Sequence, residues 1–205
     1  IEFERKEYDY IQTYCQEKEL DWSVSVWDID SLRFAEKYNI PFIKIPSAHL
    51  TNDDLIIECS KSKIPLVLST GMSDWKIIDD AVEILKKNKA QFALLHCNST
   101  YPAPEIELNL NVIGEMKKRY DCLVGYSGHE FNLEPSVLAA ALGAKIIERH
   151  ITLDHNMWGT DQGSSLEIHA MDLLRKRIIN VPKILGDKNK HISESEKLVM
   201  KKLRG

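Results

Sequence analysis

Six short apolar runs rich in β-branched and aromatic residues recur along the chain, each followed by a polar segment with helical periodicity. Their starts lie 20 to 31 residues apart, the length of one strand plus a crossover helix. Such an unbroken alternation predicts a parallel sheet whose strands are covered on both faces. The six runs are Trp22–Val26, Phe42–Ser47, Pro65–Thr70, Phe92–Cys97, Leu123–Ser127 and Lys145–Thr152.

Capping residues between these runs indicate where the crossover helices begin and end. The residues expected to cap helix starts are Ser73, Thr51 (with Asp54 three positions later) and Ser165. The helix within Leu133–Leu142 is expected to end at Gly143, and the last crossover helix near Gly186.

Two architectures contain such a sheet, a doubly wound open sheet and a (β/α)₈ barrel. A doubly wound nucleotide-binding sheet should show a glycine-rich turn after an early strand, and Gly71 and Gly125 stand alone instead. Polar residues end nearly every run, where a barrel builds its active site. We therefore expect residues 1–205 to be one partial TIM-type barrel domain, strands 3–8, with the first two βα units missing.

Composition narrows the class of protein. The 205 residues are 43% hydrophobic and 28% charged, with a net charge of −4, which gives no support for a nucleic-acid partner. The apolar runs are too short to span a bilayer, so we expect no membrane partner. The four cysteines lack C-x-x-C spacing, which disfavours a zinc ribbon or redox pair. We expect reduced thiols and a cytoplasmic location.

Lys44 lies inside an apolar strand, Phe-Ile-Lys-Ile-Pro. Burying its ammonium without an anionic partner costs several kcal/mol, so the side chain either reaches solvent or serves a function. Two functional interpretations fit the residue: a clamp for a phosphate or carboxylate, and a Schiff-base amine. The residues alone leave these alternatives open.

His129 and His150 end adjacent predicted strands, where they are either held by hydrogen bonds alone or converge on one ion. Two imidazoles leave most of an octahedral shell free, which suits Mn²⁺, Mg²⁺ or Co²⁺. Glu148 alternates to the same side as His150 and is a candidate further ligand or hydrogen-bond acceptor. His96 is a further candidate for this group, although we expect it instead to face inward in the barrel core. Asp161 lies in a loop of small and polar residues and offers a carboxylate above the barrel mouth.

Five motifs follow one another along the chain. They are Phe-Ile-Lys-Ile-Pro-Ser (42–47), Leu-Ser-Thr-Gly-Met (68–72), Leu-Leu-His-Cys-Asn-Ser-Thr-Tyr-Pro-Ala-Pro (94–104), Gly-Tyr-Ser-Gly-His (125–129) and Ile-Glu-Arg-His-Ile-Thr-Leu-Asp (147–154). In this order and spacing they resemble the bacterial N-acetylneuraminate (sialic acid) synthase family. The resemblance covers nearly the whole chain.

The resemblance implies a role for each residue at the strand ends. The positions matching the two protein ligands of the family's divalent metal, Mn²⁺ or Mg²⁺, are His129 and His150. The positions matching those that hold the phosphate and carboxylate of phosphoenolpyruvate are Lys44, Ser47, Ser99, Ser127 and, where the family often has threonine, Ser25. The residues expected on the acceptor side are Tyr101 and Asp161, which we take with Lys44 as catalytic candidates.

The resemblance implies a synthase that condenses phosphoenolpyruvate with an N-acetylmannosamine-like amino sugar, giving a sialic (nonulosonic) acid and phosphate. Three departures concern the acceptor side: His49 replaces an acidic residue, Gly128 replaces an aspartate, and Ser-Val-Trp-Asp (25–28) replaces Thr-Pro-Phe-Asp. Legionaminic or pseudaminic acid synthesis therefore stays open. A Schiff-base aldolase using Lys44, a non-catalytic barrel fragment and assembly as a homodimer stay open too.

The same resemblance implies that the chain is a fragment. The family's first two strands supply a glutamate, a lysine and a glutamine, and its antifreeze-like C-terminal domain has no counterpart here. We expect this chain alone to be poorly soluble and without measurable activity, and a version extended by about 80 residues to be active.

Overall fold

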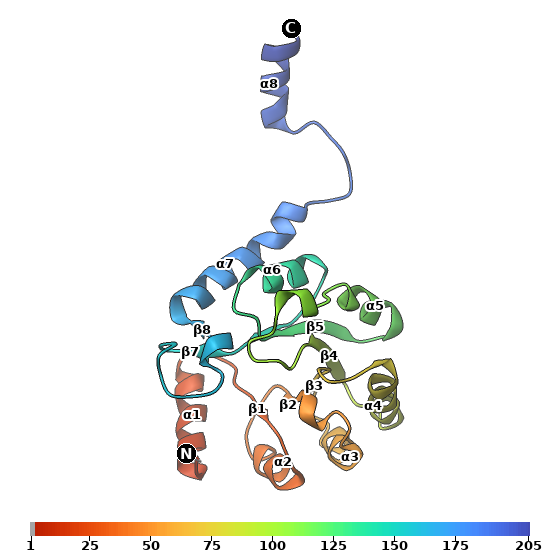
Figure 1. Ribbon diagram of the computed structural model, residues 1–205, viewed down its shortest axis with the longest axis vertical. Coiled ribbons are helices and arrows are strands. Elements are labelled where there is room, and N and C mark those ends of the chain that lie inside the picture. Colours follow the sequence, from red (N-terminus) through yellow and green to blue (C-terminus); the bar gives the residue numbers. More distant parts are fainter. Residues whose placement is uncertain (1–2) are drawn as a thin grey trace.

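Six parallel strands form the central sheet of the computed structural model, which describes residues 3–205 (Figure 1). They lie in chain order: β1 (Val24–Ser25), β2 (Ile43–Ile45), β3 (Leu66–Ser69), β4 (Phe92–Cys97), β5 (Leu123–Gly128) and β6 (Ile147–Arg149). The sheet curls, since Lys44 on β2 reaches Glu148 on β6 at 3.2 Å although three strands lie between them. The fold is therefore a half-barrel, a partial barrel of the TIM type, which confirms the predicted fold class.

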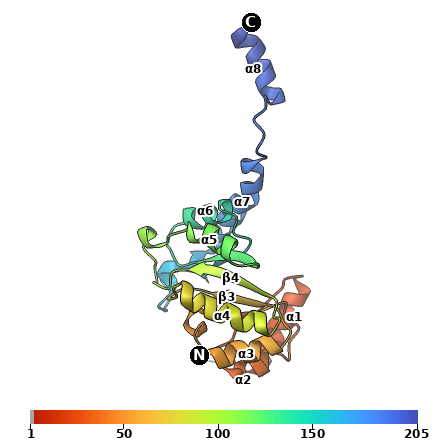
Figure 2. The same cartoon turned by 90° about the vertical axis from the view of Figure 1, so that its right-hand side faces the viewer.

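Helices cover the outer side of the curled sheet (Figure 1, Figure 2). Those that follow β1 to β5 are α2 (Ile29–Ala35), α3 (Asp53–Lys61), α4 (Trp75–Lys87), α5 (Val112–Arg119) and α6 (Glu134–Ala141). The others are α1 (Arg5–Glu17), α7 (Ile168–Leu185) and α8 (Glu194–Arg204), which extends away from the barrel in both views. One-turn 3₁₀ helices are η1 (Ser47–His49), η2 (Glu105–Glu107) and η3 (Gln162–Ser164). No helix within residues 3–205 is long and apolar enough to cross a membrane.

The two faces of the sheet pack differently. Outward residues such as Leu68 and Leu94 join the helices in one large core. On the inner face a small separate cluster of Val67, Ala93 and Leu95 packs with Phe42 and Ile146. Side chains alternate between the faces along each strand, so polar residues two positions beyond this inner cluster also point inward. The small apolar cluster thus forms a floor beneath the polar strand ends.

The last predicted strand is wrong in its extent. Lys145–Thr152 divides into β6 and a separate strand, β7 (Ile151–Thr152), which pairs in parallel with β8 (Leu166–Glu167). The backbone carbonyl of His150 accepts the N–H of Leu166 at 2.8 Å, so pairing to the returning segment takes the chain out of the main sheet. This return carries the intervening loop, with Asp161, over the end of the barrel.

The predicted helix starts are shifted by one or two residues. Asp74, and not Ser73, caps α4, because its carboxylate accepts the N–H of Ile77 at 2.9 Å. Asn52 likewise caps α3 in place of Thr51. Helix α7 begins after Glu167 instead of Ser165, and the Glu167 side chain makes no capping hydrogen bond. The predicted ends are confirmed: α6 stops before Gly143 (φ +94°) and α7 stops at Gly186 (φ +58°), where a positive φ favours glycine.

Removing the α4 cap should destabilise the protein modestly. We expect Asp74→Ala to lower the free energy of unfolding by about 1 kcal/mol, because the Ile77 N–H loses its acceptor at a partly exposed helix end. Chemical denaturation measures the difference. Asp80→Ala, which removes only an exposed ion pair with Lys76, should cost less. An equal loss in both variants would contradict the capping role.

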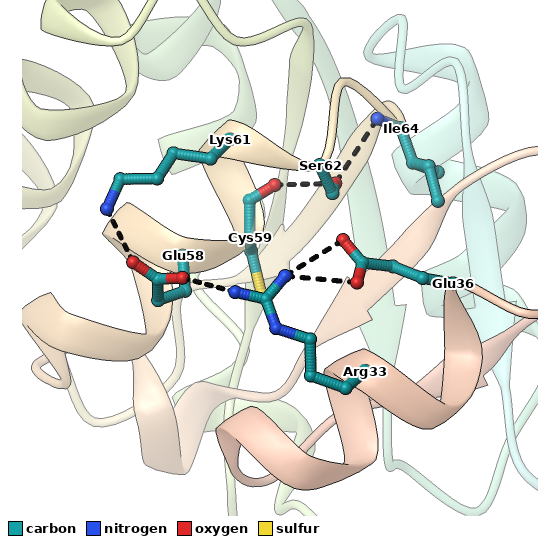
Figure 3. A network of polar contacts seen from close by, with 7 residues as sticks. All are labelled: Arg33, Glu36, Glu58, Cys59, Lys61, Ser62 and Ile64. Atoms are coloured by element: carbon teal, nitrogen blue, oxygen red, sulfur yellow. Dashed lines mark hydrogen bonds and ion pairs between the residues drawn. The ribbon is translucent and has the colours of Figure 1, made fainter.

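A polar network ties α2 to α3 (Figure 3). Arg33 donates to Glu36 at 3.0 Å and to Glu58 at 2.6 Å, and Lys61 also donates to Glu58. The hydrogen bond from Lys61 holds the pKa of Glu58 below its ordinary value. These groups are exposed and hold two neighbouring crossover helices in register, so we assign them a structural role.

Candidate active site

The inward-facing polar residues meet at one cavity of about 550 Å³ at the carboxyl ends of the strands. Residues two positions apart on a strand point to the same face. Lys44 and Ser69 therefore point inward, because each lies two positions after a residue of the inner apolar cluster, Phe42 and Val67 respectively. All nine residues singled out from the sequence line this cavity: Ser25, Lys44, Ser47, Ser99, Tyr101, Ser127, His129, His150 and Asp161. Further lining comes from Trp27, Pro46, Ala48, Ser69, Met72, Cys97 and Glu148.

On one side of the cavity, a carboxylate joins a cation and a hydroxyl. Lys44 Nζ lies 3.2 Å from Glu148 Oε1, and Ser127 Oγ donates to the same oxygen at 2.8 Å. The Lys44 side chain is only 13% exposed. Glu148 supplies the anionic partner that such a buried ammonium requires. The bonded partners of Glu148 are therefore Lys44 and Ser127. A cation and a hydroxyl donor stand together at the cavity wall, as an anion site requires.

Ser47 and Ser99 approach each other at Gly71. The Gly71 N–H donates to Ser47 Oγ at 2.9 Å. A Cβ at Gly71 would lie 2.1 Å from Ser99 Oγ and 2.9 Å from Ser47 Oγ, so a side chain there would displace both hydroxyls. Ser25 is the register partner of Lys44 between β1 and β2 and lines the same cavity. Hydroxyls from three strand ends thus line the cavity that contains Lys44.

Ser69 is a cavity-lining residue to which the sequence reasoning gave no role. It is 2% exposed, and within the described part of the chain its hydroxyl has no hydrogen-bond partner. Leaving a buried hydroxyl unpaired costs about 1–3 kcal/mol, which a ligand accepting or donating a hydrogen bond would offset. Its position two residues beyond Val67 is the signal that could have marked it as inward-facing.

His129 presents one ring nitrogen with a free lone pair. Its Nδ1 lies 2.6 Å from the Asn98 carbonyl oxygen, which can only accept, so Nδ1 carries the hydrogen. Burial lowers the pKa of His129, which keeps the ring neutral. The lone pair is therefore on Nε2. A backbone acceptor that fixes the tautomer in this way is the usual partner of a metal-binding histidine.

A second imidazole and a phenol lie beside His129. The ring centroids of His129 and His150 are 5.2 Å apart, and Tyr101 stacks on His129 with centroids 4.1 Å apart. Burial and the neighbouring His129 lower the pKa of His150, and burial raises the pKa of Tyr101 to about 12. Asp161 Oδ2 lies 3.7 Å from His150 Nδ1. At neutral pH this side offers two neutral imidazoles, a phenol donor and a carboxylate.

These residues fit a divalent ion held by few protein ligands. Within residues 3–205 no group of three or more His, Cys, Asp or Glu side chains is arranged to hold a metal. The adjacent neutral rings of His129 and His150 supply two nitrogen donors instead, and leave other coordination positions to water and substrate.

His96 does not face the barrel interior, contrary to expectation. It lies on the same side of β4 as Leu94, which packs against the helices, and its Nε2–H donates to the Leu108 carbonyl at 2.7 Å. Burial lowers the pKa of His96, in agreement with a neutral, hydrogen-bonded ring. It lines a neighbouring cavity of about 590 Å³ between the ends of β3 and β4 and helices α4 and α5.

An aromatic pair lies near the mouth of the cavity. Trp27 is 56% exposed, and its ring meets that of His49 edge-on with centroids 5.0 Å apart. These are two of the positions where the sequence departs from the sialic acid synthase pattern. The third departure, Gly128, lies on β5, and a Cβ there would come within 2.6 Å of the Glu130 carboxylate.

Comparison with known proteins agrees with this arrangement. The sequence profile of the NeuB family matches residues 1–190. The chain belongs to the NeuB family. The NeuB chain is 36% identical over 182 residues to the N-acetylneuraminate-9-phosphate synthase of Drosophila melanogaster, covering 88% of this chain and 49% of that protein. It is 34% identical over 199 residues to the N,N'-diacetyllegionaminic acid synthase of Campylobacter jejuni, covering 96% of this chain and 60% of that protein.

Solved structures show the same fold. The N-acetylneuraminic acid synthetase of Leptospira borgpetersenii in complex with citrate aligns with a TM-score of 0.90 and 33% identity, over 99% of this NeuB chain and 72% of that chain. A truncated 3-deoxy-D-arabino-heptulosonate 7-phosphate synthase from Thermotoga maritima aligns with a TM-score of 0.76 at 14% identity, a likeness of fold alone. The chain spans about half the length of the first curated relatives that it matches.

Proposed function

We propose that the cavity binds phosphoenolpyruvate and an amino-sugar aldehyde beside a divalent metal, Mn²⁺ or Mg²⁺, and joins them into a nonulosonic acid. The observation that carries this proposal is the division of one cavity into two sides. One side has a cation and several hydroxyls, and the other has two neutral imidazoles with a phenol and a carboxylate. A cytoplasmic location belongs to the proposal, supported by four free cysteine thiols.

The residues near Lys44 bind the phosphate and carboxylate of phosphoenolpyruvate. The ammonium supplies charge, and the surrounding hydroxyls, including the unpaired one of Ser69, supply directed hydrogen bonds. These groups fix the C3 carbon of phosphoenolpyruvate toward the acceptor. Because they are already in place before the reaction, they stabilise the phosphate without reorganising.

The residues near the histidines orient the aldehyde. A divalent ion held by His129 and His150 supplies Lewis-acid polarisation of the aldehyde carbonyl. The Tyr101 phenol, protonated because its pKa is raised to about 12, donates a hydrogen bond to the sugar. The Asp161 carboxylate accepts a proton from the water that adds at C2.

In the proposed reaction a bond forms between C3 of phosphoenolpyruvate and the aldehyde carbon. Water adds at C2 as hydroxide, and the C2–O bond to phosphate then breaks, which leaves a ketone at C2. Of the two protons of that water, one ends on the former aldehyde oxygen, which becomes a hydroxyl, and the other leaves with the inorganic phosphate. The products are one 2-keto sugar acid and one phosphate for each water consumed.

The product class is the finer part of the proposal. A sialic acid formed from an N-acetylmannosamine-like sugar is our first choice. Legionaminic or pseudaminic acid synthesis is the alternative, because relatives named for sialic and for legionaminic acid match at 36% and 34% identity. Of the three departures, residues 25–28 and His49 are the candidates for setting such preferences, because Trp27 lines the cavity and contacts His49, whereas Gly128 faces the buried Glu130 carboxylate.

Phosphate release tests the proposal. A version extended to the length of the relatives, supplied with Mn²⁺ and phosphoenolpyruvate, should release phosphate only when an amino-sugar acceptor is present. Comparing N-acetylmannosamine with diacetylated amino sugars ranks the acceptors. Phosphate release that needs no acceptor would overturn the condensing function.

A Schiff-base aldolase is the competing enzyme class. A Schiff-base amine must be free to attack the substrate carbonyl, whereas Lys44 is held by its ion pair with Glu148 at 3.2 Å. Borohydride reduction in the presence of pyruvate should therefore leave Lys44 unlabelled. A pyruvyl adduct on Lys44 by mass spectrometry would establish the aldolase instead.

A further inference from the structure

A fully buried ion pair lies directly behind the two histidines. Arg149 Nη1 donates to Glu130 Oε1 at 3.0 Å, and their side chains are 1% and 0% exposed. Tyr126 donates to the other carboxylate oxygen at 2.7 Å, and Ser136 donates to Oε1 at 3.1 Å. Every oxygen of the Glu130 carboxylate is thus bonded. The carboxylate of this buried pair is therefore fully hydrogen-bonded, whereas Arg149 Nε has no partner within the described residues.

The guanidinium also binds the backbone of the segment that follows β5. Arg149 Nη1 donates to the Asn132 carbonyl at 3.1 Å, and Nη2 donates to the Glu130 carbonyl. The backbone ladder between β5 and β6 ends at the pair Gly128 and Arg149. Beyond that pair, the side chain of Arg149 connects the two strand ends through its bonds to Glu130.

Gly128 makes room for this arrangement. A Cβ on Gly128 would lie 2.6 Å and 2.9 Å from the two carboxylate oxygens of Glu130, and 2.7 Å from Cε1 of the buried Tyr126 ring. The Glu130 side chain therefore folds back into the space that a side chain at position 128 would need. A carboxylate carried by residue 128 would reach nearly the same place. The Glu130 carboxylate can lie in this position because Gly128 has no side chain.

We propose that Glu130 and Arg149 are positioning residues, whose buried ion pair sets the separation and orientation of the His129 and His150 rings. His129 immediately precedes Glu130, and His150 immediately follows Arg149. The ion pair, which we call the clamp, therefore fixes the backbone next to both imidazoles. The inference rests on the proposed function in taking these rings as metal ligands. It concerns residues that touch neither substrate nor metal and act through their neighbours.

Two measurements test this positioning role on the version extended to the length of the relatives, because the 205-residue chain alone is expected to be poorly soluble. The first is nitrogen NMR of the imidazoles without metal, which reports whether His129 keeps its single Nδ1–H tautomer. The second is the dissociation constant of Mn²⁺ by electron paramagnetic resonance. Glu130→Gln leaves the Arg149 guanidinium without its counter-charge, so we expect a mixed His129 tautomer and Mn²⁺ binding weakened 10- to 100-fold, roughly the effect of losing an outer partner of a metal ligand.

A charge-relocation variant separates positioning from general damage. Glu130→Ser should behave like Glu130→Gln, and adding Gly128→Asp should return a carboxylate to Arg149 and recover most of the lost affinity. Glu134→Gln, which breaks an exposed ion pair with Arg177 on the same side of the barrel, should change neither readout.

The outcomes distinguish the positioning role of the ion pair from the proposed metal site. Unchanged imidazole signals and Mn²⁺ affinity in Glu130→Gln would overturn the clamp, as would a double variant that binds no better than Glu130→Ser. Failure of the wild-type chain to bind Mn²⁺ would remove the proposed metal site, while the metal-free NMR comparison would still decide whether the pair positions the rings.

Discussion

Replacing Lys44 with methionine should weaken phosphoenolpyruvate binding by about 2–4 kcal/mol, a loss of roughly 30- to 1,000-fold in affinity. The Lys44 ammonium is the cation among the hydroxyls of the cavity, and it is only 13% exposed. Its loss also leaves the Glu148 carboxylate unpaired beside the incoming anion, which adds repulsion to the lost attraction. Titration calorimetry of phosphoenolpyruvate into each variant measures the change.

A matched variant controls for the loss of a lysine charge. Lys61 also pairs with a glutamate, Glu58, but on the outer surface between α2 and α3 (Figure 3). Lys61→Met should therefore leave the phosphoenolpyruvate dissociation constant unchanged. If Lys44→Met bound phosphoenolpyruvate as tightly as the wild type, the assignment of Lys44 as the anion-binding residue would be contradicted.

Replacing His150 with alanine should weaken Mn²⁺ binding by at least about 100-fold. The protein offers two imidazoles to the proposed ion, and losing a direct ligand exceeds the 10- to 100-fold effect of losing an outer partner. His129→Ala should have a similar effect. His169→Ala, which removes an exposed histidine on α7, should have none. Equal Mn²⁺ affinity in His150→Ala and His169→Ala would contradict shared ligation by the histidines.

The order of the strands was predictable because the pattern repeats. Each apolar run with its following amphipathic segment is one βα unit, and consecutive units must lie side by side in a parallel sheet. The carboxyl ends of such strands meet at one end of the barrel. That rule brings the residues at the ends of the predicted strands to a single cavity, and no knowledge of individual contacts is needed.

The orientation of residues within a strand was harder to predict. In Phe92–Cys97 both faces are buried, so the apolar pattern does not tell which alternate residues point inward. His96 was therefore assigned to the wrong face. The same alternation along the strand could have shown that Ser69 points inward, but Ser69 was given no role. Its hydroxyl has no hydrogen-bond partner within the described residues.

Other features depend on contacts between distant segments. The division after Arg149 arises because His150 pairs with Leu166, sixteen residues further along the chain. The bond between Glu130 and Arg149 joins residues nineteen apart and explains why position 128 is glycine. Nothing in the local sequence around Gly128 indicates that a carboxylate two residues later occupies its space.

A crystal of the chain soaked with Mn²⁺ and phosphoenolpyruvate tests the central claim most directly, read from an anomalous difference map. We predict one manganese peak bonded to nitrogens of both His129 and His150, at about 2.0–2.3 Å. We also predict the phosphate of phosphoenolpyruvate beside Lys44 in the same cavity. A manganese peak away from both histidines, or an anion bound outside the cavity that contains Lys44, would contradict the account.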